Sequence, residues 1–314
     1  MRGPRIPTGA IPKGVRTRII AIECLGQIEE GGFVQPTLLA LGGGQLPQND
    51  QRLLREIVMG VLRNQLWLDN LITPHIKGGI KRLDHGIVLA LRVGVFQLTR
   101  LDRVPSHAAV STTVEGYKRI YGRKAAGLVN GVLRSILRTP PKEPEPLQSL
   151  KAVARRYSQP LWLLEKWHKM LGLTSTIELC EVLNSPAPLT IRPAVYEDRD
   201  WLSDTLSHED AETKPGSWTT YSLTLNHPMP FSSESFRNGV WTAQDEASQI
   251  VCELLDPQSQ DTIWDVCAAP GGKTALIQWL TRGAANCLAT DISARKVAEM
   301  NTLIGSDTTD VQVH

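Results

Sequence analysis

Hydrophobic positions in the first 140 residues recur at the three- and four-residue spacing of helices that bury one face. One such face follows an expected N-cap at Asp50 and consists of Leu53, Leu54, Ile57, Val58, Val61 and Leu62. A second helix, capped by Asp84, is apolar on nearly all sides, which predicts the buried centre of a bundle. Further helices are expected over 16–30, from Pro105-Ser106 onward, and over 123–138. Residues 15–139 therefore predict an all-α domain.

Residues 151–236 combine helical spacing with short strand-like runs, which predicts a small α+β unit. The helices are expected over 160–171, 175–183 and 201–206, and the strands over 189–192 and 218–225. Two further segments are predicted to have no regular secondary structure. Residues 1–14 predict a basic arm, and the proline-rich residues 140–150 predict a semi-rigid linker.

A strand, a glycine turn and a helix follow one another near the C-terminal end. Asp261 to Val266 is short enough for a buried parallel strand, and apolar residues recur at helical spacing from Thr274 to Leu280. In the turn between them, small residues let a ligand approach the backbone closely. The N–H groups at the helix start favour an anionic or electron-rich group. We therefore expect residues 237–314 to be an α/β domain with its ligand at this turn.

Two classes of ligand compete for the turn. Residues 272–274 match the end of a nucleoside-triphosphate loop, but Cys267 stands where that loop needs its first glycine, and Pro270 lacks an N–H. A nucleoside cofactor instead requires an acidic residue at the end of the next strand, about 20 residues on, to bind the ribose hydroxyls. Asp291 ends the expected strand 287–291. The pattern favours the nucleoside cofactor.

The net charge of +2 conceals an uneven distribution. Residues 1–140 hold 20 Lys and Arg against 9 Asp and Glu, whereas residues 141–314 hold 14 against 23. The basic residues of the second half of the predicted bundle include Lys81, Arg82, Arg100, Arg103, Lys118, Arg119, Arg123, Lys124, Arg134 and Arg138. Such an excess is typical of polyanion binding, and equally of the solvated faces of helices. Charge alone leaves both interpretations open.

The segment Asp265 to Thr274, D-x-C-A-A-P-G-G-K-T, followed by a strand ending in Asp291, resembles the cofactor motif of RNA cytosine-C5 methyltransferases of the Nop2/Sun type. That motif binds S-adenosyl-L-methionine (AdoMet). The resemblance implies that Asp291 binds the ribose and that residues 237–314 begin a Rossmann-like methyltransferase domain. It also implies an AdoMet-binding loop made of Cys267, Ala268, Ala269, Pro270, Gly271, Gly272 and Lys273.

A second resemblance covers the helical part. Residues 105–109, 114–115 and 127–134 are similar to the NusB-like RNA-binding domain that precedes the methyltransferase domain in this family. It implies that small-subunit ribosomal RNA is the partner and that residues 151–236 position it. His107 is expected to cap or pack a helix. The strand with Arg192 departs from the family pattern because Pro193-Ala194 follows it, which leaves the role of Arg192 in doubt.

The family transfers the methyl group of AdoMet to C5 of a cytosine after a thiolate has added to C6. The resemblance places that thiolate and an assisting thiol in Pro-Cys and Thr-Cys motifs, neither of which occurs here. We expect all five cysteines to be buried and the catalytic cysteine to lie beyond His314 in a longer protein, so that this chain alone is inactive. The alternative is a non-catalytic RNA-binding protein with a vestigial cofactor fold.

Other features restrict the class of protein. The longest apolar stretch, 86–99, is too short to span a bilayer, and the N-terminus lacks the apolar core of a signal peptide. An odd number of scattered cysteines forms neither a metal-spaced pair nor a disulfide framework. We therefore expect a cytoplasmic protein without a metal or a membrane segment, and the sequence predicts no oligomeric state.

Overall fold

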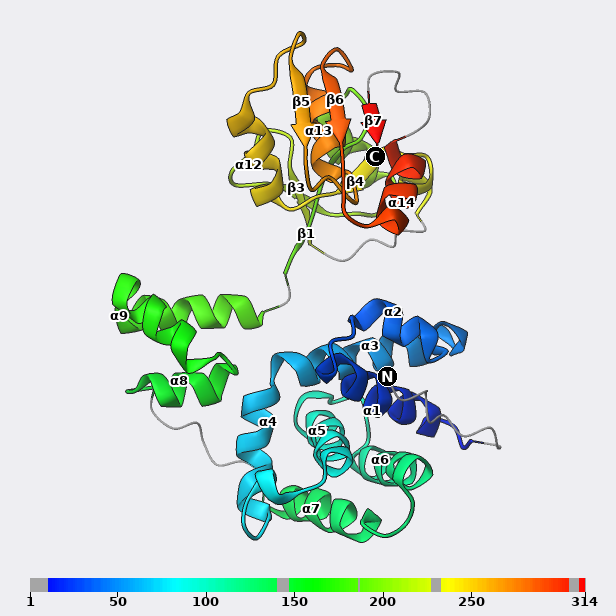
Figure 1. Ribbon diagram of the computed structural model, residues 1–314, viewed down its shortest axis with the longest axis vertical. Coiled ribbons are helices and arrows are strands. Elements are labelled where there is room, and N and C mark those ends of the chain that lie inside the picture. Colours follow the sequence, from blue (N-terminus) through cyan, green and yellow to red (C-terminus); the bar gives the residue numbers. More distant parts are fainter. Residues whose placement is uncertain (1–10, 140–146, 186, 227–232, 305–310, 314) are drawn as a thin grey trace. The chain divides into compact units, whose positions relative to one another are not determined.

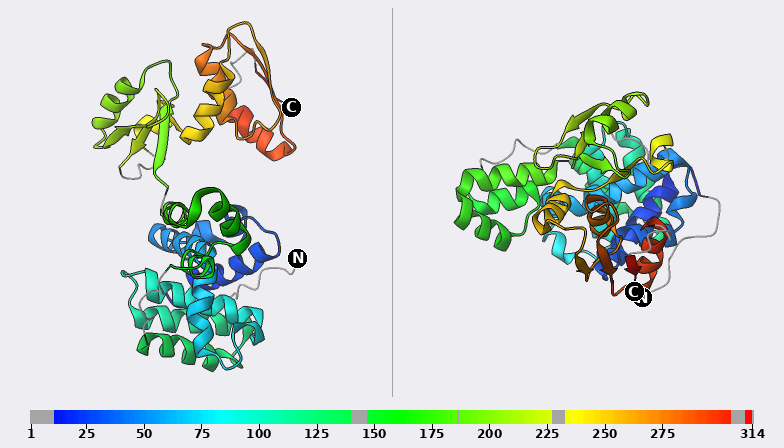
Figure 2. Two further views of the ribbon diagram at one scale, coloured as in Figure 1. Left: turned by 90° about the vertical axis from the view of Figure 1, so that its left-hand side faces the viewer. Right: turned by 90° about the horizontal axis from the view of Figure 1, so that it is seen from above.

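The computed structural model describes residues 11–139, 147–185, 187–226, 233–304 and 311–313. It divides into two compact units, residues 1–185 and 186–314 (Figures 1 and 2). Most of the expected basic arm and residues 140–146 of the expected linker lie outside the described residues. The domain boundaries drawn from the sequence stay predictions.

The first unit is helical, as the sequence predicts. A bundle of seven helices is described: α1 Val15–Glu29, α2 Val34–Ala40, α3 Gln48–Arg63, α4 Gln65–Ile72, α5 His85–Arg100, α6 Ser106–Tyr121 and α7 Ala126–Arg138. A helical pair follows, α8 Leu150–Tyr157 and α9 Leu161–Asn184, and α9 is broken at Gly172 between the two predicted segments. Helix α8 was not predicted. Its eight residues are too few to show a helical period clearly beside a proline-rich segment.

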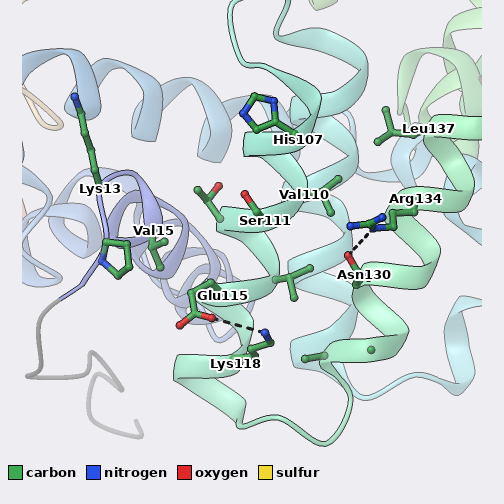
Figure 3. A pocket seen from close by; sticks show the side chains of 15 residues that line it. Lys13, Val15, His107, Val110, Ser111, Glu115, Lys118, Asn130, Arg134 and Leu137 are labelled. Carbon is green, nitrogen blue, oxygen red and sulfur yellow. Dashed lines mark hydrogen bonds and ion pairs between the residues drawn. The ribbon is translucent and has the colours of Figure 1, made fainter.

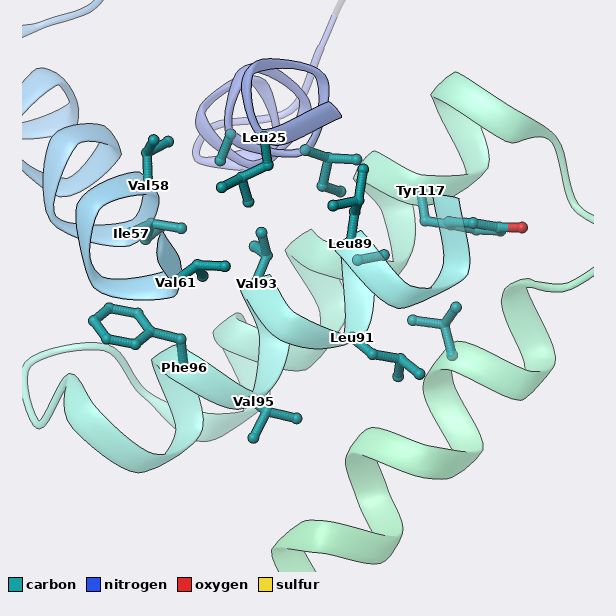
Figure 4. Close-up of a cluster of buried hydrophobic side chains, with 14 of the residues drawn as sticks. Leu25, Ile57, Val58, Val61, Leu89, Leu91, Val93, Val95, Phe96 and Tyr117 are labelled. Atoms are coloured by element: carbon teal, nitrogen blue, oxygen red, sulfur yellow. The ribbon is translucent and has the colours of Figure 1, made fainter. Parts of the chain in front are cut away.

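Helix α5 forms the centre of the bundle, which confirms the inference from its nearly all-round apolar surface. Leu89, Leu91 and Val93 are almost fully buried, and they point in different directions toward α1, α3, α6 and α7 (Figure 4). Arg92 and Gln97 are the buried polar residues described on this helix, and Arg92 connects it to two neighbouring helices. Its guanidinium donates to both carboxylate oxygens of Asp69 at 2.8 and 2.9 Å and to Glu29 at 2.8 Å, and so ties α5 to α4 and α1.

One predicted cap is confirmed and the other is wrong. Helix α5 begins directly after Asp84, as expected, although the Asp84 side chain forms no capping hydrogen bond. Helix α3 begins two residues before Asp50, with Pro47 at the N-cap position. Proline suits a helix start because its missing N–H would have no helical partner there. Asp50 lies inside the first turn instead, where its charge favours the positive end of the helix dipole.

The second unit contains a small antiparallel sheet with strand order β2-β3-β1-β4. Its strands are β1 Leu189–Pro193, β2 Thr213–Pro215, β3 Leu223–Leu225 and β4 Trp241–Ala243, and α10 Arg199–Ser207 packs against them. The apolar faces of sheet and helix meet in a core of Ile191, Leu202, Leu206, Leu223, Leu225 and Trp241. Since β4 pairs with β1, this sheet includes residues on both sides of the boundary that the sequence predicts at 236.

The strand predicted over 218–225 is wrong for its first part, because only β3 pairs. The preceding residues bind the side chain of Glu246 instead. Its Oε1 accepts the backbone N–H of Trp218 at 2.9 Å and the hydroxyl of Ser222 at 2.7 Å. A carboxylate that binds successive donors folds the segment into a loop, and no pattern of apolar residues reveals this.

The remainder of the second unit is a parallel sheet in the order β5-β6-β7, with β5 Thr262–Asp265, β6 Asn286–Ala289 and β7 Val311–Val313. Its helices are α12 Glu246–Leu255, α13 Gly272–Leu280 and α14 Ala294–Ile304, whereas the short helix α11 Glu234–Arg237 packs against β4 of the antiparallel sheet. Figure 1 shows α13 linking β5 to β6 and α14 linking β6 to β7. This is the α/β arrangement expected from the strand, turn and helix pattern. The expectation of a buried strand is wrong for β5, whose four residues are exposed or half-buried.

Candidate functional site

The turn at 267–271 connects the carboxyl end of β5 to the first residue of α13. The Ala268 N–H donates to the Thr290 carbonyl at 2.9 Å, and the Gly271 N–H donates to the Ala268 carbonyl at 2.7 Å. The Thr274 hydroxyl donates to Asp265 at 2.8 Å, which links the helix start to the strand end. These contacts fix the loop against two neighbouring strands.

Asp291 comes directly after β6, the strand next to β5. The Thr290 N–H donates to the Asp265 carbonyl at 2.9 Å, so the carboxyl ends of the two strands lie side by side. The Asp291 carboxylate accepts the Ser293 N–H at 2.9 Å. In open α/β sheets, ligands bind outside the carboxyl ends of the strands. The structure thus brings the loop and Asp291, both predicted from sequence, to one edge of the sheet.

The two glycines of the loop serve different purposes. Gly271 has a φ of +99°, a left-handed conformation that other residues rarely adopt. Gly272 has no such requirement. A Cβ there would meet only the amide of Gln244, at 3.7 Å and beyond. Gly271 therefore allows the turn to form, whereas Gly272 leaves open space beside the helix start.

The side chains of the loop differ in exposure. Cys267, Pro270 and Lys273 are exposed, and Ala268 is buried. The expectation that all five cysteines are buried is therefore wrong for Cys267, which is exposed in the turn between β5 and α13. The other four are buried, and burial raises the pKa of Cys24 to about 12 and that of Cys252 to about 11.

Two residues near the loop were not predicted as part of the site. Arg192 lies on β1 and Gln244 between β4 and α12, and both are buried. The Arg192 Nε donates to the Gln244 Oε1 at 2.5 Å, and its Nη2 donates to the Gly272 carbonyl at 3.4 Å. From the sequence, Pro193-Ala194 after this strand left the role of Arg192 in doubt. No spacing rule connects residues so far apart in the sequence.

The first unit carries a groove of about 930 Å³ between the start of α1, helix α6 and helix α7 (Figure 3). Its polar lining includes Lys13, His107, Lys118, Asn130 and Arg134. Its one acidic lining residue is Glu115, which pairs with Lys118 at 3.8 Å. The groove is therefore net positive.

Two of the basic residues singled out in the sequence, Lys118 and Arg134, line this groove. Arg134 donates to Asn130 at 3.2 Å and remains exposed. Arg100 lies elsewhere, with its guanidinium 4.2 Å from the ring centroid of Trp67. His107 is exposed at the start of α6, at the groove rim, and is not packed in the core. The other basic residues of the set are Lys81, Arg82, Arg103, Arg119, Arg123, Lys124 and Arg138, and none of these lines the groove.

Across the part of the chain that the structure describes, no cluster of His, Cys, Asp or Glu could hold a metal ion. The helices of that part include none long and apolar enough to cross a membrane.

Known proteins resemble both units. Residues 15–138 match the NusB family, and residues 252–310 match the 16S rRNA methyltransferase RsmB/F family. The probable ribosomal RNA small subunit methyltransferase B of Bacillus subtilis (strain 168) is 31% identical over 290 residues, which are 91% of this chain and 64% of that protein. The ribosomal RNA small subunit methyltransferase B of Cronobacter sakazakii is 32% identical over 300 residues, covering 92% and 66%.

The chain thus spans slightly less than two thirds of these relatives. Among solved structures, that of PH0851 resembles it with a TM-score of 0.72 at 22% identity, covering 98% of this chain and 70% of that one. Likeness at this identity concerns the fold alone.

Proposed function

Because the chain belongs to the ribosomal RNA small subunit methyltransferase B family, we propose that it binds AdoMet and small-subunit ribosomal RNA for methylation of a cytosine at C5. We assign this activity to a complete protein of this family, and the chain spans slightly less than two thirds of the length of these relatives. One observation carries the proposal: the loop 267–273 and Asp291 meet at the carboxyl ends of two adjacent parallel strands.

The residues at this edge fit AdoMet. Asp291 offers a carboxylate to the ribose hydroxyls, and the open space at Gly272 lets a ligand approach the start of α13. A buried amide nitrogen of Gln244 beside Gly272 has no hydrogen-bond partner among the described residues. An unsatisfied buried donor next to an open cradle is the feature expected where a polar ligand group belongs.

When bound, AdoMet supplies an electrophilic methyl group on its sulfonium. The residues of this chain hold the cofactor. Asp291 accepts hydrogen bonds from the ribose, and the N–H groups at the start of α13 face an electron-rich part of the ligand. Lys273 is exposed on the first turn of α13 and adds positive charge at the same edge.

Isothermal titration of the purified chain with AdoMet tests this proposal, and we expect saturable binding at one site. RNA binding without AdoMet binding would contradict it and would support the alternative, an RNA-binding protein with a vestigial cofactor fold. We further propose that residues 15–139 bind RNA and that residues 151–236 position it.

The groove between α1, α6 and α7 is the surface of the first unit that we propose for RNA. Its lysine, arginine and histidine side chains suit phosphate oxygens, and Asn130 suits base edges or ribose. The affinity of the chain for structured RNA is expected to fall steeply with salt, since phosphate contacts release counterions. Fluorescence anisotropy across a salt series should give a log–log slope of several units.

Arg134→Gln is expected to weaken RNA binding at about 50 mM salt and to reduce the salt slope by about one unit, because one phosphate contact is lost. Arg55→Gln is the matched control. Arg55 lies on α3, away from the groove, and donates to Gln35 at 2.8 Å. If the two substitutions weaken RNA binding equally, the positive charge of the whole surface attracts RNA and the groove is not a specific binding site. If the chain binds no RNA at about 50 mM salt, the basic residues only keep the helix surface hydrated and do not form an RNA-binding site.

A further inference from the structure

A cleft of about 390 Å³ lies where the helical pair α8–α9 packs against the bundle. Its charged lining residues are Arg63 at the end of α3, Arg100 at the end of α5, Arg156 near the end of α8, and Glu56. It shares no lining residue with the groove between α1, α6 and α7. The first unit therefore carries a further basic site, in whose lining three arginines outnumber one carboxylate.

Helix α8 is held on the bundle by contacts with α4. The Trp67 N–H of α4 donates at 2.9 Å to the hydroxyl of Ser158, the residue that follows α8. The ring of Trp67 also contacts the bundle side of the cleft, because the Arg100 guanidinium lies 4.2 Å from its centroid. These contacts place Arg156 of α8 and Arg100 of α5 at the same cleft, on the two sides of the contact between α8 and the bundle.

The positive charge of this cleft is not neutralised by ion pairs. None of the ion pairs between described residues includes Arg63, Arg100 or Arg156. The pKa of Arg100 is lowered, first by partial burial and then by the positive charge of Arg156. Two like charges on opposite sides of the contact between α8 and the bundle oppose that contact. An anion between them would turn the repulsion into attraction.

We propose that this cleft binds a backbone phosphate of RNA and thereby fastens the α8–α9 pair to the bundle. The inference rests on the proposed RNA function, to which it adds a second contact site and a mechanical consequence of binding. A guanidinium matches phosphate oxygens through its fork of N–H donors, and a phosphate offers oxygens to several arginines at once. All three arginines are exposed, so a polymer can reach them. Free phosphate offers the same oxygens, and the measurements below separate the two sources.

Hydrogen exchange of the α8 amides in the full chain measures how firmly this helix is held. In wild type, structured RNA should slow that exchange about fivefold, as expected for a charge-assisted contact near the surface. Arg156→Glu should slow it without RNA, because the new carboxylate pairs with Arg100, and RNA should then add no further protection. Arg155→Glu makes the same charge change in the last turn of α8, away from the cleft. It should keep the response of wild type to RNA.

RNA affinity provides a second readout. Arg156→Glu should lower the log–log salt slope by about one unit, because one phosphate contact is lost. When it is combined with Arg134→Gln, the two losses of binding free energy should add, since the cleft and the groove share no residue. Inorganic phosphate is titrated into wild type against chloride at matched ionic strength, because screening by salt alone also weakens the repulsion.

The outcomes distinguish the ideas. If RNA binds wild type but leaves the exchange of α8 unchanged, the phosphate site is wrong while the proposed RNA function stands. If Arg155→Glu and Arg156→Glu abolish the response equally, net charge accounts for it and the cleft does not. If Arg156→Glu does not slow exchange without RNA, repulsion between the arginines does not loosen α8. If inorganic phosphate slows exchange and RNA does not, the cleft binds a small anion and RNA is the wrong ligand. If wild type binds no RNA, the proposed RNA function and this site fail together.

Discussion

Incubated with tritiated AdoMet and small-subunit ribosomal RNA, the purified chain is expected to transfer no methyl group. The C5 atom of cytosine becomes nucleophilic only after a thiolate has added to C6, as the family chemistry requires. Cys24, Cys180, Cys252 and Cys287 are buried, and burial raises the pKa of each thiol. A buried thiol with a raised pKa is neither accessible nor ionised near neutral pH.

Cys267 is the exposed thiol and the one that could contradict this expectation. It belongs to the loop that we propose for the cofactor, one residue before the Ala268 N–H that binds the Thr290 carbonyl. A thiol of the loop that we propose for the cofactor would face the cofactor and not the base. We therefore expect Cys267 not to add to C6.

RNA containing 5-fluorocytosine provides the most direct measurement, because fluorine at C5 blocks release and traps a covalent adduct. We expect no adduct on denaturing gels, with AdoMet and RNA binding measured on the same sample to show that the chain is folded. Cys267→Ser is the control. Label incorporation, or a trapped adduct that disappears in Cys267→Ser, would identify Cys267 as the nucleophile and the chain as an enzyme by itself.

The local elements around the site could be predicted because local pattern determines them. The apolar run of β5 and the small residues at 267–272 predict strand, turn and helix without tertiary information. The alternation of strands and helices predicts a parallel sheet, whereas its order β5-β6-β7 was not predicted and comes from the structure. Asp291 was predicted from its distance of about 20 residues from the glycine turn, because one helix and one strand fill that interval.

Contacts between distant segments could not be predicted in this way. Arg192 and Gln244 are 52 positions apart and meet only because β1 pairs with β4. The loop at 218–222 bends around Glu246, whose sequence neighbours suggest only a helix start. Buried polar contacts of this kind depend on which strands become neighbours, and a hydrophobic pattern carries no such information. The groove of the first unit likewise requires three helices to be placed together.

Replacing Gly272 by valine is expected to weaken AdoMet binding by tenfold or more while the chain stays folded. A Cβ at this position meets only Gln244 atoms at ordinary contact distance, so the ligand-free fold has room for the first atom of a side chain here. The same side chain would fill the space through which a ligand reaches the helix start. Gly271→Val makes a useful contrast. At a φ of +99° a valine strains the backbone, and this variant should lose thermal stability as well.

Asp291→Ala should also weaken AdoMet binding, for a different reason. Each ribose hydrogen bond to a carboxylate is worth about 1.5–3 kcal/mol, so the loss of two predicts an affinity drop of about a hundredfold or more. Asp204→Ala, an exposed carboxylate on α10, is the matched control and should change nothing. On all four variants, calorimetry measures the affinity for AdoMet and thermal melts measure the stability of the fold. Unchanged AdoMet affinity in Gly272→Val and Asp291→Ala would falsify the assignment of this loop, because no other described edge of the sheet combines a helix start with an acidic strand end.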